Sequence, residues 1–350
     1  MSAGRVRKEV DEALHAFVDR QRPGLLAIGD DLEALLSALD ALLAGGKRLR
    51  PAFCYWGWRG AGAPDLPEIA AAAASLELLQ ASALIHDDVM DASDTRRGQP
   101  SAHRRFQAMH EEAGWPGSGA AFGRGAAILL GDLCLAWSGQ MYDESGLDEE
   151  ALRRGRPVYD LMRAEVMSGQ YLDMLEQARA RGTVESALRV VMYKSAKYTV
   201  ERPLHLGAAL AGAPPEVTAA LSAYGRPLGI AFQLRDDVLG VYGDPVATGK
   251  PAGDDLREGK RTVLIALALR AATPAQAEIV HSRLGDPALD AAGIEALRSV
   301  IVETGALAEC ENMIESYATE ATGALRTAPI TAEARDALED LAVAATLRHV

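Results

Sequence analysis

Apolar residues recur every three or four positions along most of this chain, and glycines and prolines interrupt the pattern at intervals. That spacing is the period of one face of an α-helix, and few segments alternate residue by residue as half-buried strands do. No Ser/Gly-rich or Pro-rich linker and no fixed-period repeat divides the chain. The pattern predicts a single all-α domain over residues 1–350. The expected helices cover residues 5–20, 31–44, 48–61, 66–90, 101–112, 121–143, 148–180, 184–211, 215–242, 261–271, 274–283, 291–303, 306–325 and 331–348.

Composition narrows the class of protein further. Lys plus Arg minus Asp plus Glu is 36 − 49 = −13, a balance that disfavours binding to nucleic acid or to an anionic membrane. The first residues contain no apolar signal core, and no uncharged run approaches the roughly 20 residues of a membrane span. Cys54, Cys134 and Cys310 lack the spacing of a metal site. We therefore expect a cytoplasmic protein without a membrane span.

The segment SLELLQASALIHDDVMD (Ser75–Asp91) is apolar at helical spacing and then ends in carboxylates. Asp87 and Asp91 are four residues apart and share one helical face, with Asp88 beside them and Gln80 two turns earlier. Carboxylates are unfavourable at a helix C-terminus, and like charges at this spacing repel by a few tenths of a kcal/mol. A solvated helix end is the ordinary alternative, but the cluster indicates a cation between the carboxylates.

A second acidic cluster lies in GIAFQLRDDVLGVYGD (residues 229–244). Gln233, Asp236 and Gly240 fall on one helical face, and Asp237 is adjacent to it. Two pairs of carboxylates on apolar helices suit Mg²⁺, which keeps several waters and commonly joins a few carboxylates to substrate phosphates. The clusters therefore predict a magnesium-bound, phosphorylated substrate.

Basic residues complete this picture. Lys47 and Arg50 follow the glycine pair of GGKRLRP, and Arg96 and Arg97 follow the first acidic cluster. Interleaved cations and carboxylates in a chain of net charge −13 suggest a metal-bound diphosphate as ligand. Further basic candidates are Lys194, Lys250 and Lys260, whereas we interpret Lys197, Arg235 and Arg257 as surface charges.

The motifs GGKRLRP, DDVMD followed by DTRRGQP, FQLRDD, and GKPAGDDLREGKRT occur in an order that resembles the trans-isoprenyl diphosphate synthases, the polyprenyl synthetase family. The resemblance runs over nearly the whole chain and points to the geranylgeranyl diphosphate synthase-like members. It implies an isoprenoid synthase fold, with many helices around a central cavity, and a homodimer. It also implies head-to-tail (1′-4) condensation of isopentenyl diphosphate with an allylic diphosphate, with three Mg²⁺ ions bound.

The resemblance also implies a role for each residue that matches a family motif. The diphosphate of isopentenyl diphosphate would be held by Lys47, Arg50, Gln80 and Arg97. Mg²⁺ would be bound by Asp87, Asp91, Asp236 and Asp237, with Asp88 in support. The allylic diphosphate would be contacted by Arg96, Lys194, Ser195 (where the family usually has Thr), Gln233, Lys250 and Lys260. His86, beside the first aspartate, is interpreted as a packing residue.

One position departs from the family. The second motif often reads DDxxD, but its third position here is Gly240. The second metal site would therefore rely on Asp236 and Asp237, with Asp244 or water completing it.

Product length is predicted from the residues that precede Asp87. In the family, bulky aromatics four or five positions earlier form the floor of the elongation tunnel, but Ala83 and Ser82 stand there. One helical pitch, about 5 Å, is comparable to one C5 unit, so the product should exceed farnesyl, with geranylgeranyl favoured. The stop would then come from Leu79, Leu76 or a residue on another helix, such as Trp137; alternatively, the small residues serve helix packing alone.

Two other functions remain open on the sequence. A class I terpene cyclase also ionises a prenyl diphosphate at DDxxD, but it lacks GGKRLRP, and aromatics make up only 5% of this chain. A non-catalytic subunit of a synthase typically loses carboxylates from the first cluster, which is complete here.

Overall fold

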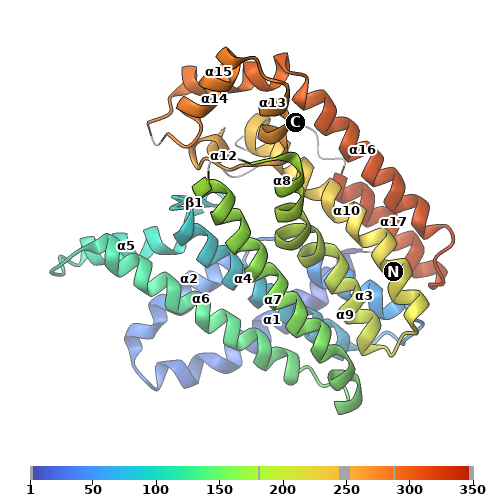
Figure 1. Ribbon diagram of the computed structural model, residues 1–350. Helices are drawn as coiled ribbons and strands as arrows, with labels where there is room; N and C mark the ends of the chain where they lie inside the picture. Colours follow the sequence, from blue (N-terminus) through green and yellow to red (C-terminus); the bar gives the residue numbers. More distant parts are fainter. Residues whose placement is uncertain (1–2, 180–181, 244–252, 287, 347–350) are drawn as a thin grey trace. The chain divides into compact units, whose positions relative to one another are not determined.

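The computed structural model describes residues 3–179, 182–243, 253–286 and 288–346, and it is helical almost throughout (Figure 1). The all-α prediction is confirmed. Close packing divides the chain into two compact units, which are residues 1–155 with 207–212 and residues 156–206 with 213–350. We call them unit 1 and unit 2. The single domain expected from the sequence stays a prediction.

Unit 1 is formed by the N-terminal helices and one short hairpin. Its elements are α1 (Ala3–Leu26), the 3₁₀ helix η1 (Asp30–Leu32), α2 (Glu33–Leu43), α3 (Leu49–Gly60), α4 (Pro67–Met90), β1 (Thr95–Arg96), β2 (Gln99–Pro100), α5 (Ala102–Glu112) and α6 (Gly119–Asp143). The helix α7 (Glu149–Arg179) begins in unit 1 and continues in unit 2.

Unit 2 contains the remaining helices. They are α8 (Val184–Val190), the π-helix η2 (Val191–Glu201), α9 (Arg202–Leu210, whose last residues belong to unit 1), α10 (Pro215–Tyr242), α12 (Asp254–Arg257), α13 (Val263–Ala271), α14 (Pro274–Arg283), α15 (Ala291–Glu303), α16 (Ala306–Leu325) and α17 (Ala332–Thr346).

The core of unit 1 is built around α4. This helix packs chiefly on α6 and also on α1 and α3. Its first half is rich in alanine, which permits close helix approach, and Leu76, Leu78 and Leu79 are fully buried; each buried leucine contributes about 2 kcal/mol. The hydroxyl of Ser138 on α6 donates to the carbonyl oxygen of Ser75 on α4 at 2.7 Å, which satisfies both polar groups inside the core. The acidic end of α4 is therefore fixed to a rigid base.

The core of unit 2 is built around α10, which carries the second acidic cluster. This helix packs on η2 and α16, and also on α13 and α17. Buried Leu, Ile and Val side chains of α10, α13, α15 and α16 form one hydrophobic cluster. The C-terminal helices α15 and α16 therefore contribute to the core on which α10 packs.

One predicted helix is interrupted by a different geometry. Residues 184–211 were expected to form one α-helix, but Val191–Glu201 are π-helical. π-Helical hydrogen bonding is rare and frequently marks functional segments, and Lys194 and Ser195 lie within this one. In contrast, α10 continues as an α-helix through Pro227.

Two helices, α4 and α6, are long and apolar enough by length and composition alone to cross a membrane. In the most apolar stretch of α4, 72% of the residues are buried inside the protein, against 33% for α6. Two such helices are weak evidence for a membrane span, because core helices have the same composition.

Candidate active site

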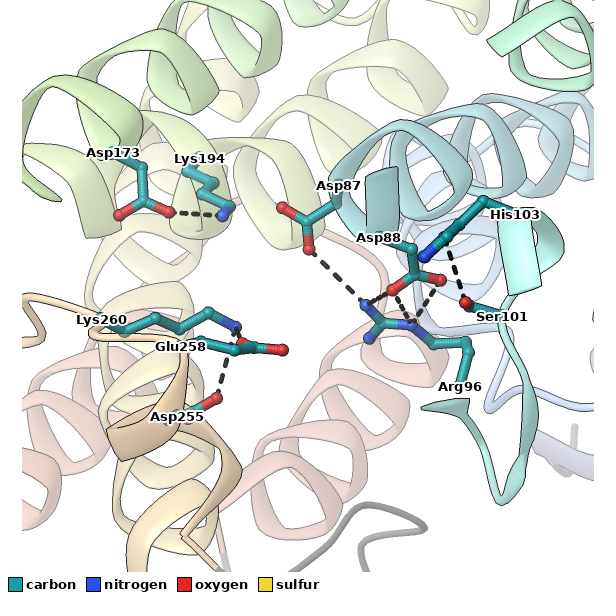
Figure 2. Close-up of polar contacts among 10 residues, drawn as sticks. All are labelled: Asp87, Asp88, Arg96, Ser101, His103, Asp173, Lys194, Asp255, Glu258 and Lys260. Atoms are coloured by element: carbon teal, nitrogen blue, oxygen red, sulfur yellow. Dashed lines mark hydrogen bonds and ion pairs between the residues drawn. The ribbon is translucent and has the colours of Figure 1, made fainter. Parts of the chain in front are cut away.

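The three aspartates of the first cluster lie at the C-terminal end of α4. Asp88 is buried, Asp87 is partly exposed, and Asp91 caps the helix. The guanidinium of Arg96 on β1 pairs with Asp88, with its Nε 3.0 Å from Asp88 Oδ1, and its Nη2 lies 3.6 Å from Asp87 Oδ2 (Figure 2). Arg96 therefore partly neutralises the negative charge of Asp87 and Asp88, and so reduces the repulsion between the carboxylates of this cluster.

The loops around this cluster contain unusual backbone conformations. Arg48, Ala92 and Arg97 are the non-glycine residues with positive φ among those the structure describes, with φ of 53°, 54° and 54°. Each such conformation costs on the order of 1 kcal/mol or more and persists where surrounding structure imposes it. All three lie in or next to the motifs: Arg48 lies within GGKRLRP, Ala92 follows Asp91, and Arg97 lies within DTRRGQP. The strained backbone conformations therefore lie beside the motif residues.

The GGKRLRP loop and the hairpin β1–β2 meet through Arg97. Its Nη1 donates to the carbonyl oxygens of Gly45 at 2.6 Å and Leu42 at 2.8 Å. Loss of hydration lowers the pKa of Arg97, and the positive charges of Arg48, Arg96 and Arg50 act in the same direction, against Glu77. Positive charge therefore accumulates here, as an anion site requires.

The polar residues in and beside this basic loop differ in burial and in their partners. Arg48 is buried and forms ion pairs with Asp11 and Glu77, both at 2.6 Å, so it is neutralised internally, whereas Lys47 is exposed. The side-chain oxygen of Gln80 on α4 is buried and has no hydrogen-bond partner in the part of the chain that the structure describes. A buried polar atom without a partner is unfavourable, and this oxygen has the capacity to accept a further hydrogen bond.

In unit 2, Lys194 of the π-helix forms an ion pair with Asp173 of α7, with Nζ 2.6 Å from Oδ2 (Figure 2). Gly169 on α7 allows this approach, because a Cβ there would lie 2.4 Å from the backbone nitrogen of Lys194. Our sequence reasoning missed Asp173. Its position one turn after Gly169 and three residues after Gln170 in GQYLD was the available signal.

The second acidic cluster faces a more buried environment. The amide of Gln233 donates to Asp237 Oδ1 at 2.7 Å, and the side chain of Asp237 is buried. Burial raises the pKa of Asp237 well above its usual range, and the negative charges of Asp255 and Asp236 add to this against the Gln233 hydrogen bond and Lys260. Asp236 is partly exposed.

Lys260 lies just after α12, among carboxylates. Its Nζ is 2.7 Å from Glu258 Oε2 and 3.3 Å from Asp255 Oδ1 (Figure 2). Neither acidic residue was among the sequence candidates. The predicted residues Lys250 and Asp244 lie outside the described residues.

The donor chemistry of both clusters fits Mg²⁺. In the described part of the chain, no three His, Cys, Asp or Glu side chains converge closely enough to hold an ion by themselves. Mg²⁺ does not require such a cage, since it usually takes one or two carboxylates, retains waters and completes its shell with substrate phosphates. Asp87 with Asp91, and Asp236 with Asp237, offer that kind of donor set.

The residues expected to be surface charges are instead integrated into the fold of unit 2. Lys197 pairs with Glu165 at 2.7 Å and its side chain is 12% exposed, and Arg235 pairs with Glu311 at 2.7 Å. Arg257 is half-buried and donates to the carbonyl oxygen of Leu289 at 3.3 Å. The surface interpretation was wrong for these residues, because burial by sequence-distant helices leaves no local signal.

The candidate chain-length residues occupy different environments on α4. Ser82 and Leu79 are buried, as is Leu76, whereas Ala83 is partly exposed on the side of the helix that carries Asp87. Trp137 of α6 is buried and packs edge-to-face on Phe17 of α1, with ring centroids 6.1 Å apart. The Nε2 atom of His86 lies 3.1 Å from the carbonyl oxygen of Ile128, so this side chain contacts α6.

The all-α fold, the aspartate clusters and the basic loops are those of the family that the sequence resembles, and comparison with known proteins identifies the class of enzyme. The family model for polyprenyl synthetase matches residues 32–301, so the chain belongs to the polyprenyl synthetase family and is a prenyl diphosphate synthase. It is 34% identical over 307 residues to geranylfarnesyl diphosphate synthase of Aeropyrum pernix, which covers 86% of this chain and 90% of the relative.

Two further relatives extend the comparison. Geranylgeranyl diphosphate synthase of Mycobacterium tuberculosis is 31% identical, covering 86% of this chain and 81% of the relative. A solved structure of geranylgeranyl pyrophosphate synthase from Corynebacterium glutamicum, complexed with isoprenyl diphosphate and magnesium, matches with a TM-score of 0.96 at 42% identity and covers 100% of both chains.

Proposed function

We propose that the chain catalyses the Mg²⁺-dependent head-to-tail (1′-4) condensation of isopentenyl diphosphate with an allylic diphosphate, releasing diphosphate. The observation that carries the proposal is the pairing of an intact aspartate cluster at the end of α4 with Arg96 and with the basic loop that Arg97 joins. The cyclase alternative does not account for this second basic site.

The roles of the residues follow from the charges that the reaction moves. Bound Mg²⁺, which we take to be three ions held by Asp87, Asp91, Asp236 and Asp237, would neutralise the charge that the diphosphate gains. Arg96, Lys194 and Lys260 stabilise the same charge as the allylic C–O bond breaks. Further contacts to the allylic diphosphate come from Ser195, Gln233 and Lys250.

The second substrate is held by other residues. Lys47, Arg50, Gln80 and Arg97 orient isopentenyl diphosphate so that its double bond attacks the allylic cation. The electron pair of that double bond forms the new C–C bond, and a proton leaves to the released diphosphate. Asp88 fixes Arg96 through its ion pair and thereby keeps that guanidinium aimed.

For the product, we propose geranylgeranyl diphosphate, with farnesyl or longer polyprenyl chains as alternatives. Ala83 is small and partly exposed on the face of Asp87, which supports a tunnel that extends past this turn. Ala83→Phe should shift the product toward shorter chains when allylic primers are elongated with labelled isopentenyl diphosphate. An unchanged product distribution would contradict the role of this position, and Ala108→Phe on exposed α5 serves as control.

We further propose a cytoplasmic homodimer. Apolar side chains on α6 are exposed, including Phe122 at 38%, Ile128 at 44% and Leu129 at 65%, and a second copy of the chain would bury them. Sedimentation of the wild type and of Leu129→Glu tests this directly. A wild-type monomer would contradict the proposal.

The reaction itself is tested with the purified full chain. Incubation with Mg²⁺, an allylic diphosphate and labelled isopentenyl diphosphate should yield a longer prenyl diphosphate and released diphosphate. A cyclic hydrocarbon would favour the cyclase instead, and no conversion would favour the non-catalytic subunit.

A further inference from the structure

The carboxylate of Asp255 lies directly on the backbone of α10 at Gly240. A Cβ built on Gly240 would lie 1.8 Å from Asp255 Oδ2 and 2.7 Å from Asp255 Cγ. Atoms cannot approach so closely, so no side chain at position 240 is compatible with the observed position of this carboxylate. The absence of a side chain from Gly240 is therefore what admits Asp255.

Position 240 is also the third position of the second aspartate motif. It follows Asp236 by four residues, so a side chain there would project from the same helical face. The space that a third aspartate of the motif would enter is thus occupied by a carboxylate from a different element, α12.

Contacts on the other side hold Asp255 in this position. Lys260 Nζ lies 3.3 Å from Asp255 Oδ1, and Glu258 holds the same ammonium at 2.7 Å. The Asp255 carboxylate therefore presents one oxygen to Lys260 and the other to the surface of α10.

We propose that Asp255 supplies, from α12, the third carboxylate of the second metal cluster, and that Gly240 is glycine in order to leave room for it. The site takes a divalent cation with oxygen preference, such as Mg²⁺, together with a diphosphate. This inference rests on the proposed function, because it assigns a further metal-binding residue to the same reaction.

The first test measures metal binding without turnover. Mn²⁺ is titrated into the full chain in the presence of inorganic diphosphate, and free Mn²⁺ is followed by electron paramagnetic resonance. Asp255→Asn should weaken the affinity of one class of site by roughly 10-fold or more, the scale of a lost metal-site partner. The matched control is Asp254→Asn, which removes the same charge one residue away in α12. Equal affinities for the two variants would overturn the proposal.

The second test addresses the room at Gly240. Gly240→Ala should weaken Mn²⁺ binding as Asp255→Asn does, and the double variant should be no weaker than either single one, because both remove the same carboxylate from its place. The displaced atoms end a side chain, so the fold should tolerate the change, which a melting curve verifies. Gly323→Ala on α16, where nothing lies within 4 Å, is the control and should leave Mn²⁺ binding unchanged.

The third test moves the carboxylate from one element to the other. Gly240→Asp combined with Asp255→Gly places the acidic group on α10 and opens the space opposite, and it should recover Mn²⁺ affinity that Asp255→Gly alone loses. Failure to recover affinity in a variant that melts normally would overturn the exchange. If the wild type elongates prenyl chains while all variants bind Mn²⁺ equally, this inference fails alone; if the wild type elongates nothing, the proposed function fails with it.

Discussion

The two acidic clusters of this protein are assembled in opposite ways. In unit 1, the cation that faces Asp88 is Arg96, eight residues along the chain, in a hairpin whose turn contains one strained residue, Arg97. In unit 2, the groups that shift the pKa of Asp237 include Gln233 on its own helix, but also Asp255 and Lys260, which lie 18 and 23 residues further along the chain. The first cluster is organised locally, and the second depends on how α12 meets α10.

The comparison predicts that the first cluster is the less tolerant of substitution. Asp87→Asn should lower kcat/KM for chain elongation by about 10²- to 10³-fold, because it removes a carboxylate that we propose binds Mg²⁺ at the allylic diphosphate. Asp236→Asn should cost less, since Asp237 and Asp255 remain nearby. Steady-state kinetics with saturating Mg²⁺ measure both, and a larger loss for Asp236→Asn would reverse the ranking.

The close approach of α7 to the π-helix is one of the tight backbone contacts in unit 2. Gly169→Ala would place a Cβ 2.4 Å from the backbone nitrogen of Lys194, which a side chain cannot relieve by rotation. We expect a loss of about 1–3 kcal/mol in unfolding free energy, together with a raised KM for the allylic substrate as Lys194 is displaced. Denaturant unfolding tests the first effect. The control is Gly323→Ala, at an exposed position of α16 with nothing within 4 Å, which should raise the unfolding free energy by about 0.5–1 kcal/mol.

Low pH should destabilise unit 2 through protonation of His205. Burial lowers the pKa of His205 to about 4, and the charge of Arg202 acts in the same direction, although Glu201 opposes it. The folded state therefore binds fewer protons than the unfolded state between pH ~6.5 and pH ~4, and stability falls as pH drops through that window, by at most on the order of 3 kcal/mol. Urea unfolding across this range should show a shallower decline for His205→Gln; identical slopes would contradict it.

The smallest expected effect concerns the strained turn after Asp91. Ala92→Gly should raise the unfolding free energy by about 0.5–1 kcal/mol, since glycine adopts the φ of 54° without strain. Ala108→Gly, at an exposed position of α5, should lower it by a similar amount, about 0.5–1 kcal/mol. Thermal melts of both variants give the signs. A destabilised Ala92→Gly would show that the turn is not strained.

Helical periodicity was sufficient to predict the long helices, because it depends only on the neighbouring residues within each segment. The first acidic cluster was predictable for the same reason: Asp87, Asp88 and Arg96 are close in sequence. The π-helical hydrogen bonding around Lys194 and its ion pair with Asp173 were not, since both depend on the packing of α7 against η2.

The same distinction explains the second cluster and the buried cations. Gly240 was recognised as a departure from the motif, but the position of Asp255 against it depends on a contact between α10 and α12. Lys197 and Arg235 were assigned to the surface because nothing in their neighbouring residues reveals Glu165 or Glu311. Tertiary contacts decided each of these cases.

The buried thiols have a practical consequence. Cys54, Cys134 and Cys310 are all buried, and burial raises the pKa of Cys134 and Cys310 to about 12 and that of Cys54 further. Maleimide dyes should therefore leave the native chain unlabelled and react only at cysteines introduced on the surface, for example at Ala108 in unit 1 and Ser282 in unit 2. Such a doubly labelled protein would let fluorescence transfer follow the spacing of the two units during turnover.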